Sequence, residues 1–202
     1  MAAPNSALCR CGLPLPGQPA AAGNDPAPLC GRCVRRPPPF SSSRAALLYG
    51  FPVDRLINRY KHRGNLAWEH FFDQLLTRHP LPWPACDALC PLPAHWQRRW
   101  HRGFDQSERL ATLLSAHWQR PLLPALRRQQ ATRHQQGLSR IQRQRNLRNA
   151  FLCVLPLQGQ HLVLIDDVMT TGSSARAASR CLLDAGAARV DVWTLARTPR
   201  AP

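Results

Sequence analysis

The chain has no long hydrophobic run and few cysteines. No apolar stretch approaches the ~20 residues needed to cross a bilayer, and the amino end has neither the basic cluster nor the apolar run of a secretory signal. Eight cysteines in 202 residues are too sparse for a disulfide scaffold. We therefore expect a cytoplasmic protein with reduced thiols, long enough for one α/β domain and a small appendage.

Acidic residues are also scarce. The chain has 11 Asp and Glu against 27 Lys and Arg, a net charge of +16. Residues 95–148 contain twelve arginines and only two acidic residues, Asp105 and Glu108, which gives this segment a net charge of +10. Such a segment predicts an anionic partner, most commonly nucleic acid. A general bias toward arginine is the alternative, since Lys61 is the only lysine, but it does not explain the shortage of acids.

The most informative stretch is residues 160–186. Leu162 to Ile165 is an unbroken apolar run, which predicts a strand buried on both faces of a parallel sheet. A polar turn follows, then residues 175–185 have helical apolar spacing before Gly186 as a C-terminal cap, and residues 190–195 predict the next strand. This order predicts a βαβ unit, whose ligands bind at the carboxyl end of its first strand.

The polar residues of that turn predict a site for a sugar phosphate. Asp166 and Asp167 could accept hydrogen bonds from adjacent sugar hydroxyls, or hold Mg²⁺ through water. The residues after them would offer a phosphate backbone N–H groups, hydroxyls and the positive end of a helix dipole: Thr170, Thr171, Gly172, Ser173 and Ser174. The alternative is an ordinary capped helix preceded by two solvated aspartates.

Four cysteines lie within the first 33 residues, in a segment rich in Pro, Ala and Gly that cannot build a core. Cys9, Cys11, Cys30 and Cys33 together predict a structural, tetrahedral Zn²⁺ site. The Cys-x-Cys half is tighter than the usual Cys-x-x-Cys, so a redox dithiol or free cysteines remain alternatives. A proline run at residues 37–39 marks a boundary, and we expect a Cys-rich zinc-finger-like segment over 1–39 and the α/β domain over 40–202.

Apolar spacing and caps predict the elements in between. Cys86 and Cys90 are expected on one face of a strand, as small buried side chains and not as metal ligands. Residues 127–148 have few apolar side chains and predict a mobile basic arm or hood beside the site. The other expected elements are a strand over 45–49, a helix from Pro52 to near Gly64, a helix from about Asn65 to Leu76, a strand over 85–92, a helix after the Asp105–Glu108 capping box, and an edge hairpin over 149–155.

The sequence Leu-Val-Leu-Ile-Asp-Asp-Val-Met-Thr-Thr-Gly-Ser-Ser resembles the phosphoribosyl-pyrophosphate (PRPP) motif of type I phosphoribosyltransferases. The resemblance implies that Asp166 and Asp167 contact the ribose hydroxyls and that the following turn holds the 5′-phosphate. Nearly the whole chain resembles the ComF/GntX family, through an ordered set of features: the amino-terminal cysteines, Lys61-x-x-Gly64, Pro91-Leu-Pro93, Arg102-Gly-Phe-Asp-Gln-Ser-Glu-Arg-Leu-Ala111, Gln136-x-Leu138, Arg145-Asn146, Ala150-Phe151 and the acidic-pair motif.

Members of that family resemble phosphoribosyltransferases preceded by a zinc finger, and several are linked to natural transformation or to the use of DNA as a nutrient. The resemblance implies a type I phosphoribosyltransferase-like parallel sheet flanked by helices. Ser174 replaces the family's usual Thr and keeps its hydroxyl, and Asp105 replaces its usual Asn and still caps a helix.

We therefore expect a PRPP-binding protein that takes Mg²⁺ with PRPP and handles imported single-stranded DNA, with a DNA-translocation helicase or other competence proteins as further partners. Two alternatives stay open: a phosphoribosyltransferase with an unknown acceptor, and a PRPP-sensing regulator. The arginines expected to contact nucleic acid or pyrophosphate are Arg98, Arg99, Arg102, Arg127, Arg128, Arg133, Arg140, Arg143 and Arg145.

Overall fold

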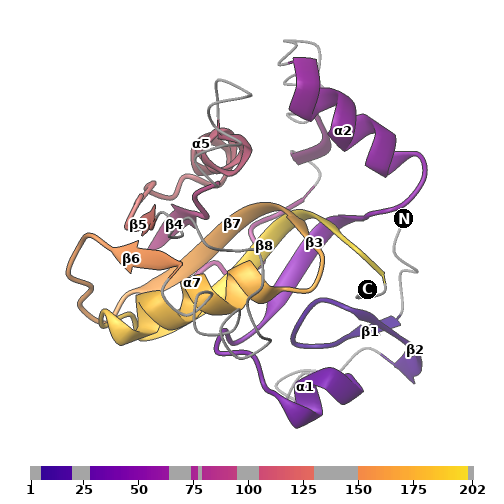
Figure 1. The fold of residues 1–202 in the computed structure, drawn as a ribbon, viewed down its shortest axis with the longest axis horizontal. Coiled ribbons are helices and arrows are strands. Elements are labelled where there is room, and N and C mark those ends of the chain that lie inside the picture. The colour runs from indigo at the N-terminus through magenta and orange to yellow at the C-terminus, as the bar shows by residue number, and fades with distance from the viewer. Residues whose placement is uncertain are drawn as a thin grey trace, which may run out of the picture.

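A computed structural model describes residues 6–19, 28–63, 74–76, 79–94, 105–129 and 150–199. Its centre is a four-stranded parallel sheet in the order β3-β8-β7-β4 (Figure 1). The strands are β3 (Ser43–Leu48), β4 (Ala88–Pro91), β7 (His161–Met169) and β8 (Arg189–Arg197). No helix in these ranges is long and apolar enough to cross a membrane.

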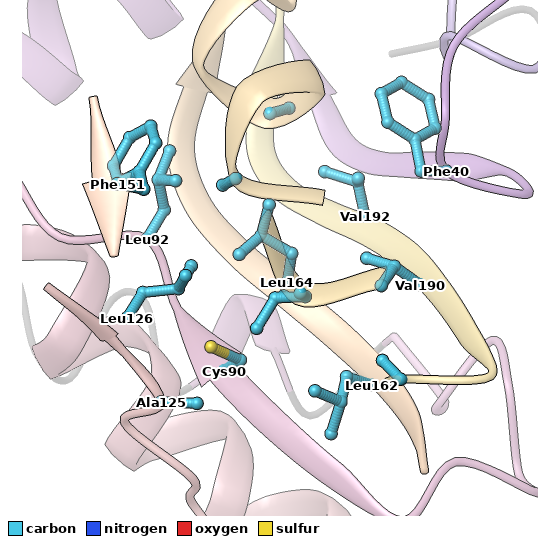
Figure 2. Packing of buried hydrophobic residues seen from close by; sticks show 14 of the residues in the cluster. Phe40, Cys90, Leu92, Ala125, Leu126, Phe151, Leu162, Leu164, Val190 and Val192 are labelled. Atoms are coloured by element: carbon cyan, nitrogen blue, oxygen red, sulfur yellow. The ribbon is translucent and has the colours of Figure 1, made fainter. Parts of the chain in front are cut away.

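The two central strands are buried on both faces, as the apolar run in β7 predicts. Leu162 and Leu164 lie in one hydrophobic cluster, whereas Val163 and Ile165 lie in another, and all four are 0% exposed. Figure 2 shows the first cluster, which includes Leu162 and Leu164. Helix α7 (Ser173–Asp184) covers that face, and α5 (Gln106–Trp118) and α2 (Val53–Arg63) contribute to the other. This α/β architecture confirms the expected fold class.

Beside the main sheet lies an antiparallel pair, β5 (Leu126–Arg128) and β6 (Phe151–Cys153). The hairpin expected over 149–155 is wrong: residues 150–155 contain one strand, β6, whose partner is β5 and not a neighbouring strand across a tight turn. Arg127 and Arg128, expected at the start of the basic arm, instead belong to β5. The rest of the expected arm, residues 130–149, lies outside the described residues, as does most of the expected second helix, of which Gln74–Leu76 are helical.

The amino-terminal segment folds as a small unit that packs against the α7-side cluster through three of its cysteines. It contains the antiparallel strands β1 (Ser6–Leu8) and β2 (Pro14–Pro19), followed by the short helix α1 (Gly31–Arg35). This unit lies near the end of β8, where Arg197 donates to the Cys11 carbonyl (Figure 1). We call residues 9–12 together with 30–33 the cysteine knuckle.

The expectation about Cys86 and Cys90 is also wrong in part. Cys86 and Cys90 do not share a face: Cys86 precedes the strand and packs in the α5-side cluster, whereas Cys90 packs in the α7-side cluster. Cys86 lies in a turn, where its N–H donates to the carbonyl of Trp83, so the alternation of a strand does not apply to it. Both side chains are buried, as expected.

Candidate sugar-phosphate site and metal centre

The loop between β7 and α7 lies at the carboxyl edge of the sheet. Gly172 is the N-cap of α7 with φ 72°, a left-handed conformation that glycine adopts without strain. Thr171 Oγ1 lies 2.9 Å from Ser173 Oγ and accepts a hydrogen bond from the Ser173 N–H at 3.3 Å. Thr170 is exposed and residues 171–174 are half-buried, so the hydroxyls and the first N–H groups of α7 gather at a surface that solvent reaches.

The acidic pair belongs to the same edge. β7 does not end before Asp166, as the polar sequence suggests, but continues through both aspartates to Met169. Both side chains are half-buried, and each accepts a hydrogen bond from the following N–H: Asp167 N to Asp166 Oδ1 at 2.9 Å, and Val168 N to Asp167 Oδ1 at 2.7 Å. These bonds hold the two carboxylates in the last part of β7, just before the hydroxyl loop, and carboxylate oxygens suit a diol or a hard cation.

The start of α5 adds a residue that sequence reasoning missed. Asp105 is the N-cap, and its Oδ1 accepts the N–H groups of Ser107 and Glu108 at 3.0 and 3.4 Å. Its Oδ2 accepts the Ala94 N–H at 2.8 Å, which holds the segment after β4 against this helix. Ser107, two residues into the cap, donates its hydroxyl to Asp166 Oδ1 at 3.3 Å. The Asp-Gln-Ser-Glu sequence signalled the cap but not this contact.

The four predicted metal ligands come together. Cys9 and Cys11 lie in the turn between β1 and β2, while Cys30 and Cys33 lie at the start of α1. Their Sγ atoms all lie within 4.8 Å of one another, with 3.5 Å between Cys9 and Cys11 and 3.9 Å between Cys11 and Cys30. A tetrahedral ZnS₄ centre with Zn–S bonds of about 2.3 Å needs sulfurs about 3.8 Å apart. The cluster therefore fits a metal ion such as zinc, and the tight Cys-x-Cys half does not prevent it.

The surroundings of the knuckle favour the thiolate form of Cys30 and oppose that of Cys33 and Cys9. Burial opposes ionisation of Cys30, but hydrogen bonds from the Cys33 backbone and from the neighbouring thiols outweigh it and lower the pKa of Cys30 to about 7. Burial, reinforced by repulsion from Cys11 and Cys9, raises the pKa of Cys33, and burial also raises that of Cys9. The cluster would therefore release protons when a metal binds.

The predicted basic contacts are only partly described. Arg127 is exposed on β5, and the Arg128 guanidinium lies 5.3 Å from the centre of the Phe151 ring. The Cys181 thiol donates to the Phe151 carbonyl, so this pair of strands packs about 12 Å along α7 from its first residue. The other seven lie outside the described residues: Arg98, Arg99, Arg102, Arg133, Arg140, Arg143 and Arg145.

Comparison with known proteins identifies relatives along most of the chain. The chain is 38% identical over 203 residues to the DNA utilization protein YhgH of Escherichia coli K12, covering 95% of this chain and 84% of the relative. It is 31% identical over 180 residues to competence protein F of Haemophilus influenzae, covering 83% and 78%, and 27% identical over 167 residues to competence protein ComFC of Bacillus subtilis, covering 77% and 64%. No protein-family model matches the chain. The identity and coverage show that this chain belongs to the ComF/GntX family, which includes YhgH and competence protein F.

Proposed function

We propose that this chain binds PRPP with Mg²⁺ and handles single-stranded DNA that enters the cell. One observation carries the PRPP part: two carboxylates and a hydroxyl-rich loop lie at the carboxyl edge of a parallel sheet, where α7 begins. Asp166 and Asp167 would accept the two ribose hydroxyls, while residues 170–174 would hold the 5′-phosphate. Residues 40–202 would form this site, and residues 1–39 would form the zinc segment.

The negative charges of the two aspartates and of the phosphate require a cation between them. A phosphate beside two aspartates would be repelled unless a positive ion or the helix dipole compensates, and α7 supplies only about half a charge. Hard oxygen ligands such as Asp166 and Asp167 suit Mg²⁺, directly or through water. When bound, Mg²⁺ would neutralise the pyrophosphate group of PRPP. We therefore expect PRPP affinity to depend on Mg²⁺.

The DNA part draws on charge and on the relatives. YhgH is named as a DNA utilization protein and competence protein F by its role in competence, and this chain carries a net charge of +16. A surface of that charge binds a nucleic-acid backbone by releasing counterions. The arginines of residues 95–148, including the exposed Arg127, are the proposed contacts.

Isothermal calorimetry tests the PRPP part. Titration of PRPP into the zinc-loaded protein should give heat with Mg²⁺ and little in Mg²⁺-free buffer. Omitting Mg²⁺ is preferable to adding a chelator, because a chelator also attacks the cysteine cluster. Asp167→Asn should weaken binding at least tenfold, whereas Asp184→Asn, at the far end of α7, should not. Absence of heat with Mg²⁺ and wild-type protein would contradict the proposal.

Fluorescence anisotropy of a labelled single strand tests the DNA part. The affinity should fall steeply as salt rises, and a flat dependence between low and moderate salt would count against it. The same samples separate the alternatives. Pyrophosphate release from PRPP with a nucleobase or amine, abolished by Asp167→Asn, would indicate a phosphoribosyltransferase. A change in DNA affinity when PRPP is added would indicate a PRPP-sensing regulator.

A further inference from the structure

Arg197, the last residue of β8, is a buried arginine that joins the cysteine knuckle to the proposed phosphate loop. Its side chain is 2% exposed. Its Nε donates to the Cys11 carbonyl at 3.0 Å, and its Nη1 donates to the Met169 carbonyl at 3.0 Å and to that of Thr170. A third Nη1 contact reaches the carbonyl of Thr198 at 2.8 Å. One rigid guanidinium thus holds a metal-ligand residue and the first residue of the loop.

This arrangement is specific, because burying a guanidinium is costly unless its donors are satisfied. The hydrogen-bond acceptors of Arg197 in the described part of the chain are main-chain carbonyls and not a carboxylate. These carbonyls can accept the N–H groups of the Arg197 guanidinium only while the knuckle and the loop both stay in place. If either the knuckle or the loop moved, a buried charge would lose its partners.

Arg176 makes a second link from the other side of the loop. It lies in the first turn of α7, where its N–H donates to the Gly172 carbonyl at 2.9 Å. Its Nη2 lies 3.5 Å from Cys33 Sγ, and its Nη1 donates to the Pro37 carbonyl at 2.9 Å. A cation beside a metal-bound thiolate stabilises the negative charge of the site. The end of the loop is therefore tied to a second predicted zinc ligand.

Met169 fills the space between these two links. It is 2% exposed. A Cβ added at Gly12 of the knuckle would lie 3.7 Å from Met169 Cε, and one added at Gly172 would lie 3.5 Å from Met169 Sδ. The same Cβ at Gly12 would lie 2.9 Å from Ser43 Oγ, so the knuckle has no room to shift toward β3. Knuckle and loop therefore both lie against the side chain of one methionine.

We infer that Arg176 and Arg197 are positioning residues through which metal binding at the four cysteines sets the phosphate loop and raises its affinity for PRPP. This inference rests on the proposed function. A bound metal fixes the Cys11 carbonyl and the Cys33 sulfur, and the two arginines carry that fixed geometry to both ends of residues 170–174. The metal segment is then part of the ligand site, not a separate appendage.

Linkage makes the inference testable in both directions. If metal raises PRPP affinity by some factor, PRPP must raise metal affinity by the same factor, and such couplings are typically about 5- to 150-fold. PRPP with Mg²⁺ should therefore lower the fraction of zinc that a coloured chelator removes from the protein at equilibrium. The calorimetric affinity for PRPP should be at least fivefold weaker in zinc-free than in zinc-loaded protein.

Variants that still bind zinc test the roles of the two arginines without removal of the metal. Arg176→Gln should retain one zinc per chain but bind PRPP several-fold more weakly than wild type. Removal of zinc should then lower the PRPP affinity of Arg176→Gln by a much smaller factor than it lowers that of wild type. Arg180→Gln removes the same charge one turn along α7, where the side chain is exposed, and should behave as wild type. Arg197→Lys keeps the buried charge but lacks the planar guanidinium, and it should also retain zinc and bind PRPP more weakly. If Arg197→Lys does not fold, the PRPP affinity of Arg176→Gln still tests the inference.

The outcomes are distinguishable. Equal PRPP affinity with and without zinc overturns the coupling and leaves the proposed function standing. PRPP affinity unchanged in zinc-loaded Arg176→Gln and Arg197→Lys overturns the roles given to these arginines. No PRPP binding by zinc-loaded wild type overturns both this inference and the proposed function. Weaker binding in Arg176→Gln, with Arg180→Gln unchanged and zinc content equal, supports the inference.

Discussion

Replacement of Asp105 tests how the start of α5 is held. Its carboxylate is 6% exposed and accepts three N–H groups, two in the first turn of α5 and one from Ala94. Loss of an N-cap costs about 1 kcal/mol, and loss of a hydrogen bond to a charged acceptor costs about 1.5–3 kcal/mol. Asp105→Ala should therefore lower the free energy of unfolding by about 3 kcal/mol.

Asp105→Asn separates the two contributions. The amide oxygen of Asn can still cap α5, but its NH₂ group would face the Ala94 N–H, so about 2 kcal/mol should be lost. The variant therefore tests whether this chain depends on the second acceptor oxygen, which binds the Ala94 N–H. Urea unfolding followed by far-UV circular dichroism measures both losses. Asp184→Ala, an exposed acid on α7, is the control and should change stability by less than about 0.5 kcal/mol.

An Asp105→Ala protein as stable as Asp184→Ala would show that Asp105 does not hold the start of α5. A loss confined to PRPP affinity, with stability unchanged, would show the same. In the structure Asp105 holds the first turn of α5, and Ser107 of that turn donates to Asp166.

Three further predictions concern other parts of the molecule. Asp191→Ala removes a carboxylate, 0% exposed, that lies 2.7 Å from hydrogen-bonding atoms of three side chains, and should lower the unfolding free energy by about 3–5 kcal/mol in urea titrations; a loss below about 1 kcal/mol would contradict this. Gly186→Ala should lower the melting temperature far more than Gly159→Ala, because both have positive φ but only at Gly186 would the new Cβ lie 2.1 Å from the Leu157 carbonyl oxygen. Zinc affinity, measured by chelator competition, should fall as pH falls, and more steeply below about 7, the pKa of Cys30, because that thiol must then also lose a proton; a pH-independent affinity would argue against thiolate ligands.

Local signals explain why β7, α7 and β8 could be predicted from the sequence. Burial on both faces requires an unbroken apolar run in β7, and the helix that follows begins and ends at glycines with positive φ, Gly172 and Gly186. The capping box at Asp105 and the four cysteines are likewise short patterns whose chemistry is local. Family resemblance supplied the order of these pieces.

The contacts between distant segments could not be predicted. Arg197 donates to Cys11, 186 residues earlier, and nothing in the sequence near either residue pairs them. The arginine at 176 looks like one of many basic residues until α7 is placed against the knuckle. The spacing of Cys86 and Cys90 predicts one shared face, and this is wrong because a turn, not a strand, precedes β4. Each of these depends on tertiary packing, which spacing alone does not encode.

A crystal structure of the zinc-loaded chain with PRPP and Mg²⁺ would show whether β7 and the loop after it hold the sugar phosphate. The 5′-phosphate should lie within hydrogen-bonding distance of the amides of residues 171–174, and the ribose hydroxyls should contact Asp166 and Asp167. Density for the sugar phosphate at another surface, with these residues facing only solvent, would contradict this prediction.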